Sequence, residues 1–415
     1  MNRLKNRIAS SLGNIIEWYD FALYGFFAPL IATLYFPSSS IDTALLKAFS
    51  VFAIGFFARP IGALLFGYIG DTYGRSVSLK ITPLLITFPT LLLSILPTYH
   101  SIGILAPITL IFLRIWQGIC IGGEYANNII YLCESTEQKH IYFWGSLGSC
   151  SSSFGIFLAS TVAAGCYTLF THSSLESIGW RLAFALSSIL GLITFFMRKN
   201  MQETHVFQNA HRKNKTIKNP ILISCRYQWR KYLIALGLTV LPAVAFNYSF
   251  VFLPSFLSTS FQIYAGDTLD SNSISLLARL FIIPVIGLIA DKIGGIAVSR
   301  LSCVLFIILS YPLLMGIMND FTNGKVIYYA FTLLTVLNAG STPGLLIELL
   351  APETRSTILS FTLNISFGMI GGVVPLACFL INDEFGSTMA SVYFLILAAF
   401  ITLIATFFFK RDNYG

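Results

Sequence analysis

The chain has 415 residues and a formal net charge of +8, and 55% of its residues are hydrophobic while only 11% are charged. A soluble globule needs more polar surface than this, so the composition excludes the soluble classes and indicates a protein of the lipid bilayer. At roughly 20 residues for each span, plus short loops, the length allows about twelve transmembrane helices.

Apolar runs bounded by proline, glycine or charge predict two sets of spans. The first set covers residues 10–35, 45–70, 77–96, 102–132, 142–165 and 180–197, and the second covers residues 232–261, 271–290, 297–318, 326–350, 356–380 and 387–409. Continuous apolar runs favour helices over a β-barrel, because a helix satisfies its own backbone hydrogen bonds in lipid. We therefore predict an all-α membrane protein with twelve transmembrane helices in two six-helix bundles, residues 1–197 and 232–415, joined by a polar linker at residues 198–231.

Most of the positive charge lies outside the predicted spans. Of the 26 Lys and Arg residues, 20 lie in the N-terminus, in alternate loops or at the C-terminus, and nine of these lie between Arg198 and Lys231. By the positive-inside rule, we expect both termini and the linker in the cytoplasm, and we expect no binding of nucleic acid. Glu17 and Asp20 interrupt the first apolar run, which indicates an uncleaved first span rather than a signal peptide.

The cysteines and histidines do not suggest a metal site. The seven cysteines form no CxxC pair and mostly lie in apolar runs, which is typical of small core residues rather than of metal ligands or disulfides. The five histidines lie in or near loops, and no catalytic or nucleotide-binding motif is present. We therefore expect no metal, no cofactor and no enzymatic activity.

Two predicted helices carry a stripe of polar residues. In the first helix the stripe is Asn14, Glu17, Asp20 and Tyr24, and in the fourth it is Arg114, Gln117, Glu124 and Asn128. Carboxyl groups in an apolar cavity can take up and release a proton near neutral pH, so Glu17, Asp20 and Glu124 are the predicted proton-coupling residues. The alternative is that Glu17 or Glu124 is held by Arg114 or Arg59 in a structural ion pair.

Residues 58–76 recur in the second half of the chain at an offset of 220. The matching pairs are Ala58 and Ala278, Arg59 and Arg279, Gly67 and Gly287, Ile69 and Ile289, Asp71 and Asp291, and Gly74 and Gly294. Each copy is an apolar helix end, with glycines that permit close helix contact, followed by a charged turn. A duplicated membrane unit is the simplest interpretation, because internal repeats are common in secondary transporters.

The repeat places Arg59 and Arg279 at equivalent positions. Each lies twelve residues before the turn aspartate, or roughly 18 Å along its helix, which is near the membrane midplane. Because arginine binds a carboxylate through two parallel hydrogen bonds, we predict that Arg59, Arg114 and Arg279 bind a substrate carboxylate; the alternative for Arg59, which the sequence favours, is a purely structural role. Further candidate substrate-binding residues are Tyr24, Asn128, Asn247, Asn338 and Asn364.

The charged residues at the turns indicate a gate rather than a substrate site. The predicted gating residues are Asp71, Arg75, Glu134, Asp291 and Arg355. Glu348 lies near the same membrane edge, where we expect it to cap a helix or to pair with Arg355. In the fifth helix Gly145, Ser149 and Ser153 have the spacing of close helix packing. Trp18, Tyr19 and Tyr24 together give a weak signal for an aromatic wall around a cation.

Several strings resemble one family. The turns Gly70-Asp71-Thr72-Tyr73-Gly74-Arg75 and Ala290-Asp291-Lys292-Ile293-Gly294-Gly295 resemble the turn between the second and third helices of the major facilitator superfamily and its second-half copy. Gly13-Asn14-Ile15-Ile16-Glu17-Trp18-Tyr19-Asp20-Phe21, Arg59-Pro60-Ile61-Gly62, Gln117-Gly118, Gly122-Gly123-Glu124-Tyr125, Gly179-Trp180-Arg181 and Glu203-Thr204-His205-Val206-Phe207 resemble its metabolite:proton symporter family, over residues 10–405. The second-half turn departs from the family, which usually has two arginines after the glycine where this chain has Gly294-Gly295.

The resemblance implies a multi-pass protein of a bacterial inner membrane that works as a monomer, with a small molecule and a proton as its partners. It implies a proton-coupled symporter that imports a small carboxylate-bearing metabolite, either a zwitterion of the proline/betaine type or a di- or tricarboxylate, by rocking of the two bundles. The alternatives are an uncoupled uniporter or exchanger, and a membrane sensor that binds without transport.

Overall fold

The computed structural model describes residues 2–37, 41–135, 140–212, 220–260, 265–319 and 321–411. Within these ranges the chain is almost entirely helical and contains no strand. Eleven helices of this part of the chain are long and apolar enough to cross a membrane, and a bent pair at the N-terminus brings the number to twelve. The prediction of an all-α membrane protein with twelve spans is therefore confirmed.

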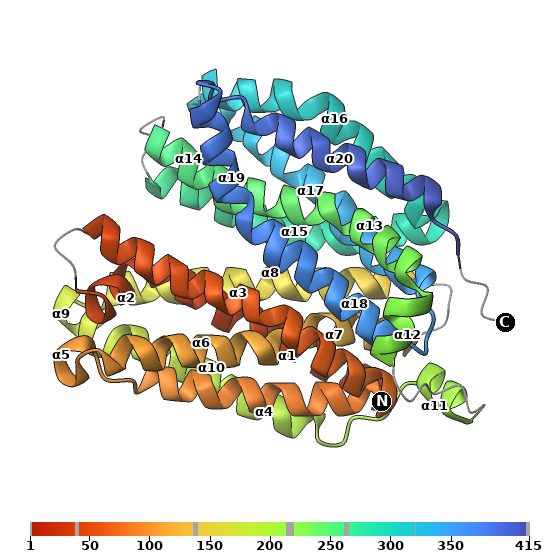
Figure 1. Ribbon diagram of the computed structural model, residues 1–415. Helices are drawn as coiled ribbons and strands as arrows, with labels where there is room; N and C mark the ends of the chain where they lie inside the picture. The colour runs from red at the N-terminus through yellow and green to blue at the C-terminus, as the bar shows by residue number, and fades with distance from the viewer. Residues whose placement is uncertain are drawn as a thin grey trace.

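The first bundle runs from red to yellow-green in Figure 1. Its elements are α1 (Asn2–Phe26), α2 (Ala28–Tyr35), α3 (Ile41–Thr72), α4 (Arg75–Ser94), α5 (Tyr99–Ile102), α6 (Leu105–Ile121), α7 (Glu124–Glu134), α8 (Ile141–Leu169), α9 (His172–Ser174), the π-helix η2 (Leu175–Gly179) and α10 (Trp180–Arg198). The helices α1 and α2 form one span with a bend of 61°. Pro29 lies in the first turn of α2, where it cannot donate a backbone hydrogen bond to α1.

The second bundle runs from green to blue in Figure 1. Its elements are α13 (Trp229–Asn247), the π-helix η3 (Tyr248–Phe252), α14 (Leu253–Ser260), α15 (Ala265–Ile293), α16 (Gly295–Asn319), α17 (Phe321–Leu349), α18 (Arg355–Leu363), the π-helix η4 (Asn364–Ile370), α19 (Gly371–Glu384) and α20 (Ser391–Phe408). The segments α13–η3–α14 and α18–η4–α19 each form one span.

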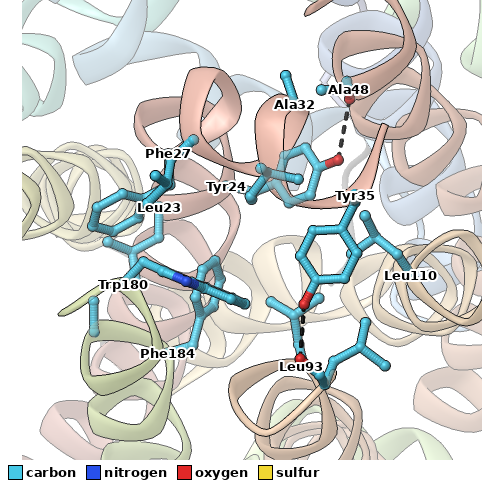
Figure 2. Packing of buried hydrophobic residues seen from close by; sticks show 14 of the residues in the cluster. Leu23, Tyr24, Phe27, Ala32, Tyr35, Ala48, Leu93, Leu110, Trp180 and Phe184 are labelled. Carbon is cyan, nitrogen blue, oxygen red and sulfur yellow. Dashed lines mark hydrogen bonds between the residues drawn. The ribbon is translucent and has the colours of Figure 1, made fainter. Parts of the chain in front are cut away.

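Each bundle has its own apolar core. In the first bundle Leu23, Phe27, Trp180 and Phe184 pack together, as Figure 2 shows. Tyr24 and Tyr35 are buried in the same core, and their hydroxyls donate to the carbonyl oxygens of Ala48 at 3.1 Å and Leu96 at 2.9 Å. Tyr248, Phe252, Phe306 and Phe331 belong to the core of the second bundle. Large apolar side chains are exposed on the outside, as a surface in contact with lipid acyl chains requires.

Five helices make the main contacts between the bundles. The helix α8 packs against α15 and α17, and α3 packs against α18. The repeated glycines lie at these contacts. A Cβ atom on Gly67 would stand 2.7 Å from Cα of Thr357, and one on Gly287 would stand 2.9 Å from Cα of Phe143. The glycine pair of the repeat therefore lets each bundle approach the backbone of the other.

The charged turns of the repeat share one backbone form. Gly74 has a φ of 117° and Gly294 a φ of 90°, values that a residue with a Cβ rarely adopts. Both turns lie at the end of the molecule where α1 begins and α20 ends, and where the two short helices α11 (His205–Arg212) and α12 (Pro220–Tyr227) also lie (Figure 1). We call this the linker end.

The predicted linker, residues 198–231, is described except for residues 213–219, which lie outside the described ranges. It contains α11 and α12, and its bounds stay a prediction. One expectation about it is wrong. We counted Arg198 with the basic residues of the linker, but it is the last residue of α10 and its side chain is fully buried in the first bundle.

Candidate transport site

A small cavity of about 50 Å³ lies between the two bundles. Its walls come from both halves of the chain. The first bundle contributes Trp18, Tyr125, Ser149, Ser152, Ser153 and Ile156, and the second contributes Pro242, Phe246, Arg279, Thr335, Ala339 and Phe367. The serines of α8, which the sequence indicated as packing residues, therefore also face the cavity.

Arg279 is the charged group of this cavity. Its side chain is buried, with 4% exposed, and its guanidinium lies over the rings of Phe250 and Phe246 at 4.9 and 5.5 Å from their centres. One terminal nitrogen donates to Thr335, while Nε has no hydrogen-bond partner among the described residues. The guanidinium therefore keeps donor capacity for an anion in the cavity.

Three aromatic rings of the cavity form a corner. Tyr125 stands at 87° to Trp18, with ring centres 6.1 Å apart, and at 87° to Phe367, with ring centres 6.4 Å apart. The Tyr125 hydroxyl lies 3.2 Å from Ser149 Oγ. Sequence reasoning did not select Tyr125 or Phe367, although Tyr125 follows Glu124 in a recognised string. Tyr19 and Tyr24 lie in the apolar core instead, so Trp18 is the one member of the expected aromatic wall that lines the cavity.

The other two candidate arginines lie in the first bundle, and neither lines this cavity. The guanidinium of Arg59 lies 4.3 Å from the ring centre of Phe21 and 4.7 Å from that of Phe56. The guanidinium of Arg114 lies 4.2 Å from the ring centre of Tyr24 and donates to Gln117 at 3.0 Å. Each keeps buried nitrogens without a partner in the described chain, so their predicted role in substrate binding stays a prediction.

Glu17 and Asp20 are buried on the same face of α1. Asp20 accepts one hydrogen bond from Gln117 at 2.8 Å, and its second carboxylate oxygen has no partner in the described part of the chain. Glu17 lines a second, smaller cavity between α1, α4, α7 and α10, and its Oε2 also lacks a partner there. Two buried carboxyl groups therefore have oxygen atoms that can take a proton without loss of an existing hydrogen bond.

Glu124 lines the same small cavity but is fully paired. Its two oxygens accept from the guanidinium of Arg198 at 2.5 and 3.0 Å, and one of them also accepts from Thr82. Arg198 donates further to the carbonyl oxygens of Ala9, Ser10 and Leu79. The expected ion pair of Glu124 with Arg114 or Arg59 is therefore wrong in its partner, which is Arg198. A Cβ atom on Gly13 would stand 2.0 Å from this guanidinium, so the pair needs glycine there.

Two of the four candidate asparagines form hydrogen bonds between helices, and the cavity-lining residues include neither these asparagines nor Tyr24. Asn128 accepts from Ser10 at 2.7 Å, and Asn247 donates to Ala243 within its own span at 3.0 Å. Asn364 joins the bundles through a 2.6 Å hydrogen bond to the carbonyl oxygen of Gly122. Asn338 is buried, and neither atom of its amide has a partner within the described ranges. Their substrate contacts stay a prediction.

A first set of contacts joins the bundles at the linker end. Asp71, at the end of α3, accepts hydrogen bonds from the backbone N–H groups of Ser356 at 2.9 Å and Thr357 at 2.8 Å, in the first turn of α18. Glu134 lies between two arginines, 3.3 Å from Arg75 Nε and 2.8 Å from Arg355 Nη1. We call Asp71, Arg75, Glu134 and Arg355 the first lock.

A second set repeats this arrangement with the bundles exchanged. Asp291, at the end of α15, accepts from the backbone N–H groups of Tyr142 at 2.9 Å and Phe143 at 3.1 Å, in the first turn of α8. The Tyr142 hydroxyl donates to Glu348 at 2.6 Å, and Arg411 lies 3.3 Å from Glu348. We call Asp291, Tyr142, Glu348 and Arg411 the second lock. The expected pairing of Glu348 with Arg355 is wrong, because Arg355 reaches Glu134 of the other bundle.

Comparison with known proteins supports this fold and places the chain in a family. The family model described as "Sugar (and other) transporter" matches residues 6–221. A glycine betaine/proline/ectoine/pipecolic acid transporter of Dickeya dadantii is 30% identical over 421 residues, which cover 99% of this chain and 84% of that protein. The proline/betaine transporter of Escherichia coli is 29% identical, over 95% of this chain and 81% of that protein.

Solved structures agree in fold. The proton:xylose symporter XylE, bound to 6-bromo-6-deoxy-D-glucose, matches with a TM-score of 0.76 at 16% identity, and the match covers 98% of this chain and 95% of XylE. The fucose:proton symporter FucP of E. coli matches with a TM-score of 0.71 at 11% identity, over 99% of this chain and 100% of FucP. The chain is thus a multi-pass membrane transporter that belongs to the major facilitator superfamily, in the family that includes these proline/betaine transporters.

Proposed function

We propose that this protein is a proton-coupled symporter that imports a small zwitterion of the proline/betaine type. The observation that carries the proposal is the central cavity, which sets one buried guanidinium, Arg279, on the second bundle and an aromatic corner, Trp18 and Tyr125 with Phe367, at the meeting of the two. A carboxylate bound by Arg279 and a cationic nitrogen packed in the corner would draw both bundles onto one ligand.

The charge of the cavity favours a zwitterion over a di- or tricarboxylate. Arg279 is the one cationic side chain among the lining residues that the structure describes, so a second or third carboxylate would lack a partner there. Aromatic faces attract an onium group, and they do not attract an anion. The curated relatives are named for glycine betaine and proline, which each carry one carboxylate and one positively charged nitrogen.

For proton coupling, Glu17 and Asp20 have the better geometry. Each has an oxygen without a partner among the described residues, whereas both oxygens of Glu124 are bonded to Arg198. Glu17 and Glu124 line the same small cavity, so a proton on Glu17 changes the balance of charge inside the first bundle. We assign the coupling proton to Glu17 and Asp20, with Glu124 as the fixed neighbour that responds to it.

The two locks would form the gate of alternating access. Both close the linker end, where Asp71 and Asp291 each bind the start of a helix in the other bundle. With the linker and both termini in the cytoplasm of a bacterium, this conformation is closed toward the cytoplasm. Rocking of the bundles would break the locks and open the cavity on that side. One chain contributes all walls of the cavity, which is consistent with a monomer as the working unit.

The test is uptake into proteoliposomes of labelled glycine betaine, proline, oxoglutarate and citrate, each with and without an inward proton gradient. We expect gradient-driven accumulation of the two zwitterions only. Accumulation of oxoglutarate or citrate would instead assign the protein to the di- and tricarboxylate importers. Equilibration that ignores the gradient would indicate a uniporter or exchanger, and binding without uptake would indicate a sensor.

A further inference from the structure

The two locks occupy equivalent positions of the repeat but differ in chemistry. At the offset of 220, Asp71 corresponds to Asp291 and Arg75 to Gly295. At an offset of 214, Glu134 corresponds to Glu348, Arg355 to Ile141 and Ser356 to Tyr142. The second lock thus keeps the aspartate and the glutamate, but it has no arginine at the positions equivalent to Arg75 and Arg355.

The side chain of Tyr142 fills the space that the missing arginine leaves. A Cβ atom on Gly295 would stand 2.0 Å from the ring atom Cε1 of Tyr142, and one on Gly344 would stand 2.3 Å from Cδ1. The ring therefore lies directly on two glycine backbones of the second bundle. An arginine at position 295 and a tyrosine at position 142 exclude each other, because both need the same volume.

Tyr142 also makes the hydrogen bonds that close the lock. Its backbone N–H donates to Asp291 and its hydroxyl donates to Glu348, so a single residue of the first bundle contacts both acidic residues of the second. In the first lock this work is divided, because Ser356 and Thr357 contact Asp71 while Arg355 contacts Glu134. Arg411, whose side chain is 58% exposed, supplies the positive charge near Glu348.

We propose that Tyr142 is the gating residue of the second lock and replaces the arginine that the repeat would place at position 295. It is a positioning residue. It holds Glu348 and the start of α8 together while the linker end is closed, and it releases them when that end opens. The proposal rests on the alternating access proposed above, but not on the identity of the substrate or on proton coupling.

Cys133 provides a native reporter of the gate. Its thiol is buried, with 4% of the residue exposed, and it donates to the carbonyl oxygen of Ile141 at 3.4 Å. Cys133 is the neighbour of Glu134 in the first lock, and its partner Ile141 is the neighbour of Tyr142 in the second, so the thiol lies between the two locks. Opening of the linker end should expose this thiol, whatever the substrate.

The experiment measures the rate at which a maleimide labels Cys133 in the purified full chain, with the other cysteines replaced. We expect Tyr142→Phe, which keeps the ring and removes the hydroxyl, to raise the rate roughly tenfold, because the hydrogen bond to a charged group is lost. The matched control is Tyr35→Phe, which removes a buried tyrosine hydroxyl at the opposite end of the molecule and should leave the rate unchanged. If Tyr142→Phe does not purify as a monodisperse protein, Glu348→Gln weakens the same bond from the other bundle and should raise the rate as well.

A rescue separates gating from packing. Tyr142→Ala should raise the labelling rate more than Tyr142→Phe does. Adding Gly295→Arg to Tyr142→Ala should bring the rate back toward that of the wild type, because Arg75, at the equivalent position of the first lock, bonds both Glu134 of its own bundle and the carbonyl oxygen of Pro352 in the other. Equal rates for the wild type and Tyr142→Phe, or no rescue by Gly295→Arg, would overturn the proposal. Failure of the wild type to accumulate any zwitterion would overturn the proposed function and leave this result untouched.

Discussion

The two bundles share a scaffold but not their charges. Away from the locks, the first bundle buries Glu17, Asp20, Glu124, Arg59, Arg114 and Arg198, whereas the second bundle, as far as it is described, buries Arg279. The duplicated arginines show the divergence, because Arg59 lies against aromatic rings of its own bundle while Arg279 faces the shared cavity. The difference teaches that the two copies of a duplicated unit can diverge, with most of the buried charges in one copy and the charged group of the shared cavity in the other.

The largest expected effect separates Glu124 from Glu17 within the first bundle. Glu124→Gln leaves the buried guanidinium of Arg198 without its counter-ion, which should cost about 3–5 kcal/mol of folding free energy. Glu17→Gln removes a carboxylate that has no ion-pair partner within 4.0 Å among the described residues, so it should change stability little. The measurement is unfolding of both variants in detergent, followed by the loss of helical signal. If the two variants unfold with equal free energy, the ion pair between Glu124 and Arg198 does not stabilise the fold.

The next effect tests the second bundle as the anion site. Arg279→Ala should raise the KM for glycine betaine and for proline roughly 100-fold, because a charge-assisted pair with the carboxylate is lost. Arg59→Ala is the matched control at the equivalent position of the repeat, and we expect it to change the KM much less. A larger KM change for Arg59→Ala than for Arg279→Ala would reverse the division of work between the bundles.

Proton coupling should show a smaller, roughly tenfold effect. With one proton per substrate, an inward gradient of one pH unit supports roughly tenfold accumulation, since that is the ratio that about 1.4 kcal/mol provides. Glu17→Gln should abolish this accumulation and leave exchange of labelled for unlabelled substrate intact. Accumulation that survives in this variant removes Glu17 from the proton path, and Asp20→Asn is then the variant to compare.

The smallest effect concerns the aromatic corner. Trp18→Leu should weaken binding of glycine betaine about fivefold, because a cation–π contact contributes about 1 kcal/mol. The control is Trp116→Leu, a tryptophan that packs against Phe88 and Phe112 outside the cavity. Competition by unlabelled glycine betaine against labelled proline gives both affinities in one assay. If the affinity for glycine betaine falls equally in the Trp18 and Trp116 variants, the aromatic corner does not bind the substrate specifically.

Much of the fold could be predicted because bilayer physics acts on local sequence. Long apolar runs specify helices, and the repeated turn with Gly74 and Gly294 predicts two related halves of the chain. The bend after Phe26 was missed, since Pro29 lies in an apolar run that reads as one span. Arg198 was assigned to the linker because its neighbours in sequence are basic, and only the folded chain shows its side chain reaching back to Ala9 and Glu124.

The candidate site was less predictable, because its walls come from positions far apart in the chain. The stripe on α1 pointed to Glu17, and the weak aromatic signal pointed to Trp18. No local pattern marks Phe367, which meets Tyr125 only after the bundles pack together. Likewise, Glu348 and Arg355 are close in sequence and were expected to pair, yet the helix start at Arg355 directs that side chain across to Glu134. Contacts between the bundles depend on how the bundles pack, so they cannot be predicted from the spacing of residues in the sequence.

Asp71 and Asp291 each accept two hydrogen bonds from backbone N–H groups of the opposite bundle. Every residue except proline offers such a donor, so these two contacts survive almost any substitution in the first turns of α8 and α18. Substitutions in the first turns of α8 and α18 therefore leave these hydrogen bonds between the two bundles intact. The side chains at these positions are therefore free to change during evolution. The side chain at position 142 could acquire a gating role while the backbone contact to Asp291 kept the two bundles together.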